Sequence, residues 1–210
     1  MYTFFKRVID IFFCIIAFPF FLIILFFVYI AIKLDDGGPI FYRAPRIGKN
    51  CKEFNMIKFR SMKVDAENIL NEDGSTYNAK DDPRVTRIGS MLRESSIDET
   101  PQLFNVLFGE MSAIGPRASA WNALLTYEED ELDKMKVRPG ITGYTQAYYR
   151  NGLSVREKRL MDAWYANNIS PWLDVRIFFK TIQTIVTLKN VYTNGIKGIS
   201  ENNTATPLSK

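Results

Sequence analysis

Two adjacent carboxylates, Asp98 and Glu99, are the residues of this sequence best placed to carry out chemistry. The sequence contains no histidine, which removes the commonest general base, the histidine-assisted Ser and Cys nucleophiles, and the usual zinc ligands. The two cysteines, Cys14 in an apolar run and Cys51 in a predicted loop, offer neither a disulfide framework nor a metal cluster. Acid–base or metal chemistry must therefore rest on carboxylates, Lys, Tyr or Cys.

The two carboxylates are predicted to lie at the start of a helix. Ser96 and Glu99 have the spacing of a capping box, which makes Ser96 one candidate N-cap. Pro101 favours a later start with Asp98 as the cap, because proline is tolerated only in the first turn. In both registers Asp98 lies where unpaired N–H groups favour negative charge, an arrangement that most often only complements the helix dipole. The same place suits a bound phosphate, and the helix is predicted to end near Gly109.

Basic residues surround the pair. Arg84, Arg87 and Arg93 precede it at near-helical spacing, which suits a pyrophosphate substrate or anionic lipid headgroups. Lys58 and Arg60 flank Phe59 on a predicted strand, where they either face phosphate or form a solvated face. A rigid Pro- and Gly-rich loop at 138–143 precedes Gln146, Tyr144, Tyr148 and Tyr149. Its glycines would allow close approach to a substrate, and the tyrosines would suit stacking on a base or sugar. The candidate phosphate- and nucleotide-binding residues are Lys58, Arg60, Arg93, Arg117, Arg138 and Gln146.

Residues 11–32 carry no charge and are predicted to lie in a membrane. As a helix they would be roughly 33 Å long, about the thickness of a hydrocarbon core. The pattern does not favour a cleaved signal peptide, because the run is too long and no small-residue cleavage site follows it. Pro19 predicts a kink or turn within the run. Basic residues flank both ends, so the positive-inside rule gives no orientation, and a spanning helix and a helix that turns back both stay open.

The remaining pattern predicts a mostly helical α+β protein. The length of 210 residues, with 47% hydrophobic content, fits one domain, and the net charge of +4 does not indicate nucleic acid. We expect short strands at 39–42 and 54–62 joined as a hairpin, and helices at 66–70, 121–132, 155–165 and 172–190. Ser154 and Glu157 form a capping box for the third of these helices. Residues 73–82 are predicted to form a polar loop, and residues 128–131 a solvated acidic patch. The apolar stripe of the last helix fits either core packing or a membrane interface.

Short motifs occur in a fixed order along roughly residues 1–190. They are Phe5-Lys6-Arg7 with Asp10, Gly38-Pro39-Ile40-Phe41, Lys58-Phe59-Arg60-Ser61-Met62, Asp82-Pro83-Arg84-Val85-Thr86, Ser96-Ile97-Asp98-Glu99, Gly115-Pro116-Arg117, Arg138-Pro139-Gly140-Ile141-Thr142-Gly143 and Asp162-Ala163-Trp164-Tyr165. Each motif alone is weak, but the ordered set resembles the monotopic bacterial phosphoglycosyl transferases, the bacterial sugar transferase family.

The resemblance implies an activity and roles for particular residues. Such enzymes move a sugar 1-phosphate from a UDP-sugar to undecaprenyl phosphate and release UMP, which initiates membrane glycan assembly. Asp98 would be the nucleophile that carries a covalent phosphosugar, and Glu99 would help to hold Mg²⁺. The N-terminal segment would be a re-entrant membrane helix broken at Phe18-Pro19, where relatives often have serine before the proline. Ala118 is a second departure, because relatives usually have proline there.

The implied organisation is a membrane helix at 1–35, a catalytic domain with amphipathic interfacial helices at 36–192, and a disordered tail at 193–210. The expected location is the bacterial cytoplasmic membrane, with the catalytic domain on the cytoplasmic face. The expected partners are a UDP-sugar, undecaprenyl phosphate and membrane lipid, with no nucleic acid; downstream glycosyltransferases and an oligomer are also compatible with it. The alternatives are direct one-step transfer and a non-catalytic, membrane-anchored scaffold or lipid-phosphate-binding relative. The sequence does not specify the sugar.

Overall fold

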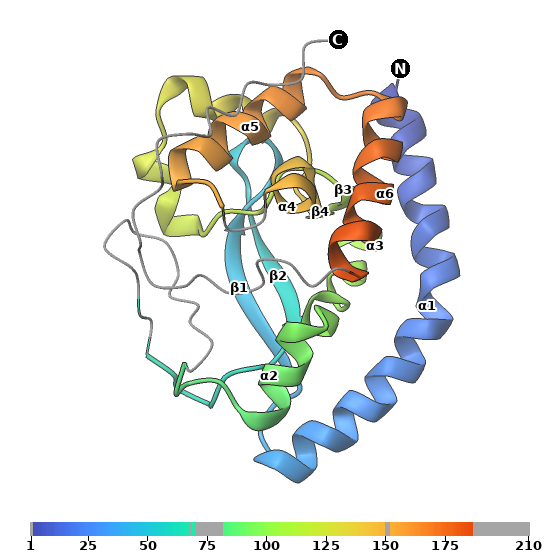
Figure 1. Ribbon diagram of the computed structural model, residues 1–210, viewed down its shortest axis with the longest axis vertical. Coiled ribbons are helices and arrows are strands. Elements are labelled where there is room, and N and C mark those ends of the chain that lie inside the picture. Colours follow the sequence, from blue (N-terminus) through green and yellow to red (C-terminus); the bar gives the residue numbers. More distant parts are fainter. Residues whose placement is uncertain (1, 68, 70–81, 150–151, 187–210) are drawn as a thin grey trace.

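The computed structural model describes residues 2–67, 69, 82–149 and 152–186, and within them the chain is mostly helical with two small sheets (Figure 1). The prediction of a mostly helical α+β fold is confirmed. The α-helices are α1 (Tyr2–Asp35), α2 (Arg87–Glu94), α3 (Gln102–Phe108), α4 (Tyr144–Tyr148), α5 (Val155–Asn167) and α6 (Pro171–Val186). The strands are β1 (Phe41–Ile47), β2 (Glu53–Phe59), β3 (Ser112–Ile114) and β4 (Gly140–Thr142). The 3₁₀ helices are η1 (Lys49–Cys51), η2 (Ile97–Glu99), η3 (Trp121–Thr126) and η4 (Glu129–Lys136).

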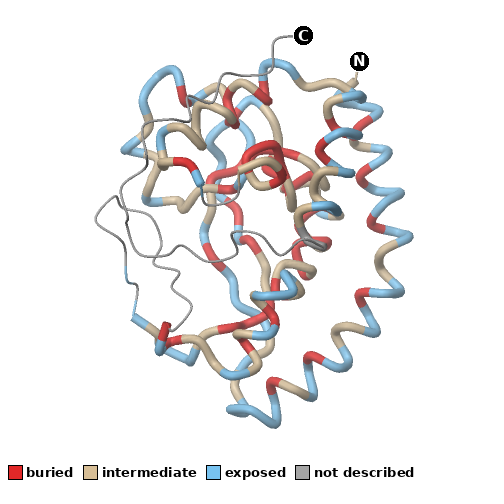
Figure 2. The backbone as a smooth tube through the Cα atoms, viewed as in Figure 1, coloured by how far each residue is buried: buried red, intermediate tan, exposed pale blue. Residues whose placement is uncertain are grey.

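Helix α1 lies against the rest of the molecule from its first turn to its last (Figure 1). Near its start, Asp10 accepts hydrogen bonds from Ser112 Oγ at 3.0 Å and from the Ala113 amide at 2.9 Å. Beyond its end, Asp36 forms an ion pair with Arg60 on the same body. Buried positions recur at intervals along α1 between exposed ones (Figure 2). Both flanks of the apolar run are therefore attached to one folded body.

The predicted break at Pro19 is absent from the structure. Helix α1 is continuous from Tyr2 to Asp35 with Pro19 inside it, and it bends as it follows the body (Figure 1). Phe18 packs against Phe21 and Phe104, with ring centroids 6.0 Å apart in both pairs. Because contacts of this kind hold the helix on each side of the proline, the missing N–H donor bends the helix without ending it.

The outer face of α1 is apolar and exposed. Most of its aromatic and aliphatic side chains lie outside the core, although the helix is long and apolar enough to cross a membrane. A contiguous apolar surface of this extent is rarely left in water, so it indicates membrane association. The most exposed of these side chains between residues 12 and 27 are Phe12, Ile15, Phe20, Ile23, Phe26 and Phe27.

The predicted hairpin is present, with longer first and shorter second strands than expected. β1 and β2 pair antiparallel, so that Tyr42 lies opposite Lys58 and Arg46 lies opposite Phe54. Phe59 stacks on Phe21 of α1, with ring centroids 6.1 Å apart, and this contact joins the hairpin to the core. The hairpin thus presents one end of β2 to the segment that carries the carboxylate pair.

The short parallel pair formed by β3 and β4 was not predicted. Its strands are only three residues long, and three glycines let the flanking backbones approach each other closely. A Cβ on Gly143 would lie 1.9 Å from the Gly115 carbonyl oxygen, and one on Gly140 would lie 2.1 Å from the Gly115 nitrogen. The glycines of the 138–143 loop therefore allow close backbone packing. Their close approach to a substrate stays a prediction.

Two further segments differ from their predictions, and two others are not tested. The helix predicted at 121–132 is two 3₁₀ helices, η3 and η4, and Glu131, expected in a solvated acidic patch, is buried against Arg156 and Arg159. Ala66, Glu67 and Ile69 are not helical. The predicted loop at 73–82, apart from Asp82, and the predicted tail at 193–210 lie outside the described residues.

The two C-terminal helices follow their predictions more closely. Ser154 caps α5 and forms the predicted capping box with Glu157. In α6 the stripe side chains that the structure describes point outward: Val175, Phe178, Phe179 and Ile182 are all more than two-fifths exposed, whereas Ile177 is fully buried. This exposure argues against core packing as the reason for the stripe.

Candidate active site

Asp98 and Glu99 lie in the short helix η2, between α2 and α3; Ser96 occupies the N-cap position of η2, as one register predicted, and Asp98 caps neither η2 nor α3. Ser96 has φ 58°, in the left-handed region, and its side chain caps nothing; α3 begins only after Pro101. The positive φ turns the chain out of α2 and directs the pair toward β2. The predicted helix end at Gly109 is confirmed, with φ 85° at the C-cap.

Lys58 of β2 holds Glu99 in an ion pair, with 2.6 Å between Nζ and Oε1. The buried side chain of Asn105 on α3 fixes β2 in place: its Oδ1 accepts from the Ile57 amide at 2.9 Å and its Nδ2 donates to the Asn55 carbonyl at 2.8 Å. The strand position next to Lys58 is therefore locked to the helix that follows Glu99. Of the two strand interpretations, the structure places Lys58 at the carboxylates.

The pKa values of the two neighbouring carboxyl groups are shifted in opposite directions. Burial raises the pKa of Asp98 to about 6, an effect that Lys58 opposes and Glu99 reinforces. Burial acts on Glu99 too, but Lys58, Arg117 and a hydrogen bond with Gln102 outweigh it and lower the pKa of Glu99 to about 2. Glu99 is therefore ionised throughout the physiological range, whereas Asp98 is a buried carboxyl that ionises close to neutrality. Such a split is typical of sites in which two acids perform different tasks.

Arg93 lies behind Asp98 and adds positive charge to its surroundings. Its Nε donates to Ser61 Oγ at 2.9 Å. This contact depends on the close approach of α2 to the Ser61 backbone, because a Cβ on Gly89 would lie 1.9 Å from the Ser61 carbonyl oxygen. Arg93 thus lies beside the pair, as predicted, with its guanidinium anchored to the segment that follows β2.

A cavity of about 100 Å³, named here the Glu99 cavity, opens beside the pair. Its size suits several ordered waters or a small anionic group. The structure brings together the predicted residues Lys58, Glu99, Arg117 and Gln146 in its wall. It adds Arg46 and Gln102, which sequence reasoning missed. One weak feature of the sequence could have indicated Arg46. It lies two residues after Ala44, which is buried, and therefore on the same face of β1, whereas Arg43 lies on the other face.

Two of the predicted phosphate-binding residues lie elsewhere. Arg60 is buried in a structural contact, where it pairs with Asp36 and donates to the Pro39 carbonyl at 2.6 Å. Arg138 donates to the Gly109 carbonyl at 2.7 Å and borders a different cavity. Neither lines the Glu99 cavity. Tyr144, which the sequence offered for stacking on a base or sugar, is only 1% exposed in the core around α4.

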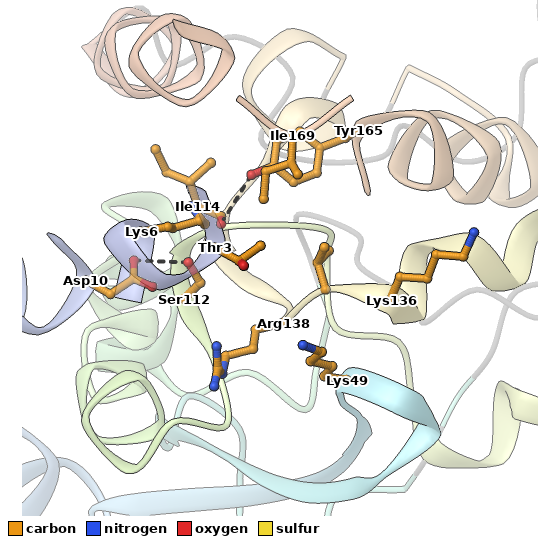
Figure 3. A pocket seen from close by; sticks show the side chains of 11 residues that line it. Thr3, Lys6, Asp10, Lys49, Ser112, Ile114, Lys136, Arg138, Tyr165 and Ile169 are labelled. Atoms are coloured by element: carbon orange, nitrogen blue, oxygen red, sulfur yellow. Dashed lines mark hydrogen bonds between the residues drawn. The ribbon is translucent and has the colours of Figure 1, made fainter. Parts of the chain in front are cut away.

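The second cavity, named here the Lys6 cavity, has a volume of about 30 Å³ and lies where the first turns of α1 meet β3 and the segment after η4 (Figure 3). Lys6 forms a 2.6 Å ion pair with Asp174 of α6. Asp10 accepts a hydrogen bond from Ser112 (Figure 3). Tyr165 donates to Asp174 at 2.6 Å. These side chains satisfy one another and fasten α1 to the body.

Asp162 on α5 joins two walls of the Glu99 cavity. Its carboxylate accepts from the Arg117 amide at 3.2 Å and from Thr145 Oγ1, on the helix of Gln146, at 2.9 Å. Lys134 pairs with Asp162 at 3.2 Å and donates to the Arg117 carbonyl at 3.1 Å. Both are buried, so this network fixes the backbone on either side of Arg117. The sequence had singled out Asp162 as part of a motif without assigning it this role.

The arrangement supplies what phosphoryl transfer needs without histidine. A buried carboxylate can act as a covalent nucleophile toward phosphate, and the neighbouring cations can stabilise charge that develops on phosphate oxygens. Among the described residues there is no cluster of three or more His, Cys, Asp and Glu side chains that could hold a metal ion. The Asp98–Glu99 pair nevertheless fits Mg²⁺, which commonly binds one or two carboxylates together with substrate phosphates.

Comparison with known proteins agrees with this geometry. Residues 1–188 match the family described as bacterial sugar transferase. The chain is 40% identical over 198 residues to an uncharacterized sugar transferase of Haemophilus influenzae, covering 89% of this chain and 42% of that protein. It is 38% identical over 193 residues to a UDP-N-acetylgalactosamine-undecaprenyl-phosphate N-acetylgalactosaminephosphotransferase of Aeromonas hydrophila, covering 89% and 45%.

A third relative is matched over nearly its whole length. It is the exopolysaccharide production protein PSS of Rhizobium leguminosarum bv. phaseoli, which is 38% identical over 193 residues, with 87% of this chain and 95% of that protein covered. The chain spans less than half of the first two relatives. The matches confirm the resemblance drawn from the ordered motifs.

Proposed function

The chain belongs to the bacterial sugar transferase family, and from this premise we propose that it transfers a sugar 1-phosphate from a UDP-sugar to undecaprenyl phosphate and releases UMP. The observation that carries the proposal is the buried Asp98 carboxyl, whose pKa burial raises to about 6, beside the Lys58–Glu99 ion pair and a cavity with two arginines in its wall. This combination supplies a nucleophile and a binding place for anions within one small site.

In the proposed first step, an ionised Asp98 oxygen attacks the sugar-linked phosphorus of the donor. A bond forms between that oxygen and phosphorus, the bridging P–O bond of the diphosphate breaks, and UMP leaves with the bond's electron pair. In the second step a phosphate oxygen of the lipid attacks the same phosphorus and the Asp98 carboxylate leaves. Lys58, Arg93 and Arg117 all place positive charge near Asp98, where it stabilises the negative charge of the transferring group.

Mg²⁺ is the expected cofactor of this chemistry. Glu99 would hold the ion, with Asp98 beside it, and the ion would neutralise charge on the donor phosphates. The low pKa of Glu99, about 2, supports this role because the ligand stays ionised at any physiological pH. The residues of this chain then have separate tasks: Asp98 bonds to phosphorus, Glu99 binds the cation, and Lys58 fixes Glu99.

We place the catalytic body on the cytoplasmic face, with α1 entering the membrane without crossing it. The support for this topology is that Asp10 near one end of α1 and Asp36 beyond the other both contact the same body. We expect the exposed apolar stripe of α6 to lie in the membrane interface. An added N-terminal cysteine, in a variant without Cys14 and Cys51, should resist impermeant reagents outside intact cells; labelling from outside would indicate a spanning helix.

The test of function is a screen for UMP release from UDP-sugars, with undecaprenyl phosphate and Mg²⁺, using the full chain in detergent micelles. Asp98→Asn should lower turnover by at least about 10³-fold and abolish transfer of label from donor to protein. Asp133→Asn, an exposed aspartate paired with Lys136, is the matched control and should retain turnover.

The outcomes separate the alternatives. Full turnover by Asp98→Asn would overturn the assigned nucleophile. Turnover without a trapped adduct when the acceptor is withheld would favour direct one-step transfer. No UMP release from any UDP-sugar would favour the non-catalytic scaffold.

A further inference from the structure

We propose that Arg46 is a substrate-binding residue and that its guanidinium, together with that of Arg117, binds the diphosphate group of the donor. The inference rests on the proposed function for the identity of that donor. What carries it is the juxtaposition, in the wall of the Glu99 cavity, of two arginines that form no close ion pair among the described residues.

Arg46, which is partly buried, differs from the buried arginines Arg60 and Arg84. Arg60 pairs with Asp36, and Arg84 pairs with Asp82 at 2.7 Å. Among the described residues no hydrogen bond or ion pair holds the Arg46 guanidinium, and its Nε is buried without a partner. Burying a charged donor that nothing satisfies is costly, so its retention in the wall of a cavity points to a ligand that satisfies it.

The fold forces Arg46 and Arg117 to face the same space. The Ile47 amide donates to the Ser119 carbonyl at 2.9 Å, and Arg46 forms a β-bridge with Ala120. These backbone contacts tie the loop that follows Arg117 to the end of β1. Burial first, and the neighbouring charge of Arg117 second, lower the pKa of Arg46 below its ordinary value. The protein therefore holds two mutually repelling cations in place by its backbone.

The charges in the cavity define the class of ligand. Lys58 is neutralised by Glu99, so Arg46 and Arg117 supply the surplus positive charge. Two planar guanidinium forks match two phosphate groups, since each fork can donate two parallel hydrogen bonds. Gln146 Oε1, a buried acceptor in the same wall, also has no partner. Phosphate oxygens cannot donate to it at neutral pH, so the ligand also carries a hydroxyl or N–H group, as a nucleoside diphosphate sugar does.

The experiment compares Arg46→Met with Arg43→Met in the full chain, in detergent micelles at fixed MgCl₂. Arg43 is the matched control because it lies on the same strand, is exposed and lies outside the cavity. Binding of UDP and of inorganic pyrophosphate is measured by titration calorimetry. We expect Arg46→Met and Arg117→Met to raise the Kd of both probes by about 10- to 100-fold, and Arg43→Met to change it by less than about twofold.

Thermal unfolding without ligand distinguishes binding from a structural role. Removing an unpaired buried charge should leave the unfolding temperature of Arg46→Met unchanged or higher, while the stabilisation that UDP gives the wild type is lost. If Arg46 had a structural role, Arg46→Met would lower the unfolding temperature measured without ligand. Arg46→Lys keeps the charge without the fork, and we expect its Kd to lie between those of the wild type and Arg46→Met.

Several results would overturn the inference: an unchanged Kd in both arginine variants, an effect on UDP without one on pyrophosphate, or UMP release by Arg46→Met at the wild-type KM. If Arg46→Met is unstable without ligand, the role is structural and the inference is wrong. The two proposals can fail separately. Arg46-dependent binding of both probes without UMP release from any UDP-sugar would remove the proposed function and keep the diphosphate site.

Discussion

The Glu99 cavity and the Lys6 cavity are both lined by charged side chains, and they differ in how those charges are satisfied. Around the Lys6 cavity, Lys6 is paired with Asp174 at 2.6 Å and Asp10 accepts from Ser112 at 3.0 Å. In the Glu99 cavity, Arg46 Nε and Gln146 Oε1 are buried without partners. The difference separates a structural joint, which is complete by itself, from a site that a ligand completes.

The same contrast distinguishes the carboxylates of the two regions. Asp174 accepts from Lys6 and from Tyr165, so its negative charge is compensated by groups of the fold. Asp98 has a pKa raised by burial to about 6, and no hydrogen bond within the described residues compensates its charge. If the comparison is right, neutralising Asp174 should damage the fold, whereas neutralising Asp98 should damage activity alone.

The largest expected effect on stability is that of Asp174→Asn. The substitution leaves the buried Lys6 ammonium without its counter-ion, which typically costs about 3–5 kcal/mol. For a chain of this size that corresponds to a fall of about 10 °C in the thermal unfolding temperature, measured in detergent micelles. Asp133→Asn, at an exposed pair with Lys136, should leave the thermal unfolding temperature nearly unchanged. Equal effects of the two substitutions on the unfolding temperature would show that Asp174 is not a structural carboxylate.

Asp98→Asn should have the opposite effect on stability: the variant should be more stable than the wild type. Because burial raises the pKa of Asp98 from 3.8 to about 6, the folded state holds a proton at pH values where the unfolded chain has lost it. Ionisation of Asp98 therefore costs the folded state free energy above about pH 6, and a neutral Asn should restore up to about 3 kcal/mol at about pH 8. The gain should disappear below about pH 4. Denaturant unfolding in EDTA at both pH values measures it; a less stable variant at about pH 8 would contradict the prediction.

The pH dependence of kcat/KM should follow Asp98 and not Glu99. The nucleophile must be ionised, so kcat/KM should fall about tenfold per pH unit below about 6 and level off above it. Glu99, with a pKa of about 2, should add no step in this range. Lys58 lowers the pKa of Asp98, so in Lys58→Met, if measurable activity remains, the fall should begin at higher pH. A profile that is flat to about pH 5 would assign the nucleophile elsewhere.

The smallest effect is expected for Thr145→Val, an isosteric change that removes one hydrogen bond to Asp162. One neutral donor to a charged acceptor is worth about 1.5–3 kcal/mol, but only part of this reaches the substrate through Gln146. We expect the KM for the donor to rise severalfold, with kcat nearly unchanged. Thr181→Val, whose hydroxyl contacts Thr142 away from Asp162, is the control. Equal changes in KM for the two variants would show that Asp162 does not position α4.

Local sequence patterns were sufficient to predict those features that depend only on neighbouring residues. The capping box at Ser154 and Glu157 and the C-cap at Gly109 were predicted because each depends on neighbours within a few residues. The choice between the two cap registers was not, because Ser96 adopts a left-handed conformation that no neighbouring residue requires. The β3–β4 pair was also missed, since strands of three residues carry no readable alternation.

The sequence by itself determined the class of this protein. The ordered set of motifs indicated the bacterial sugar transferase family, and an uncharged run long enough for a membrane indicated membrane association. Both inferences depend on composition and order alone. Which charged side chains have partners within the protein became clear only from the packing of the chain. Lys58 meets Glu99 across 41 positions of sequence, and Asp162 meets the Arg117 amide across 45. Such long-range contacts set the different pKa values of Asp98 and Glu99. They also place Arg60 outside the site and Arg46 within it, because the packed chain determines the burial and the partners of each side chain.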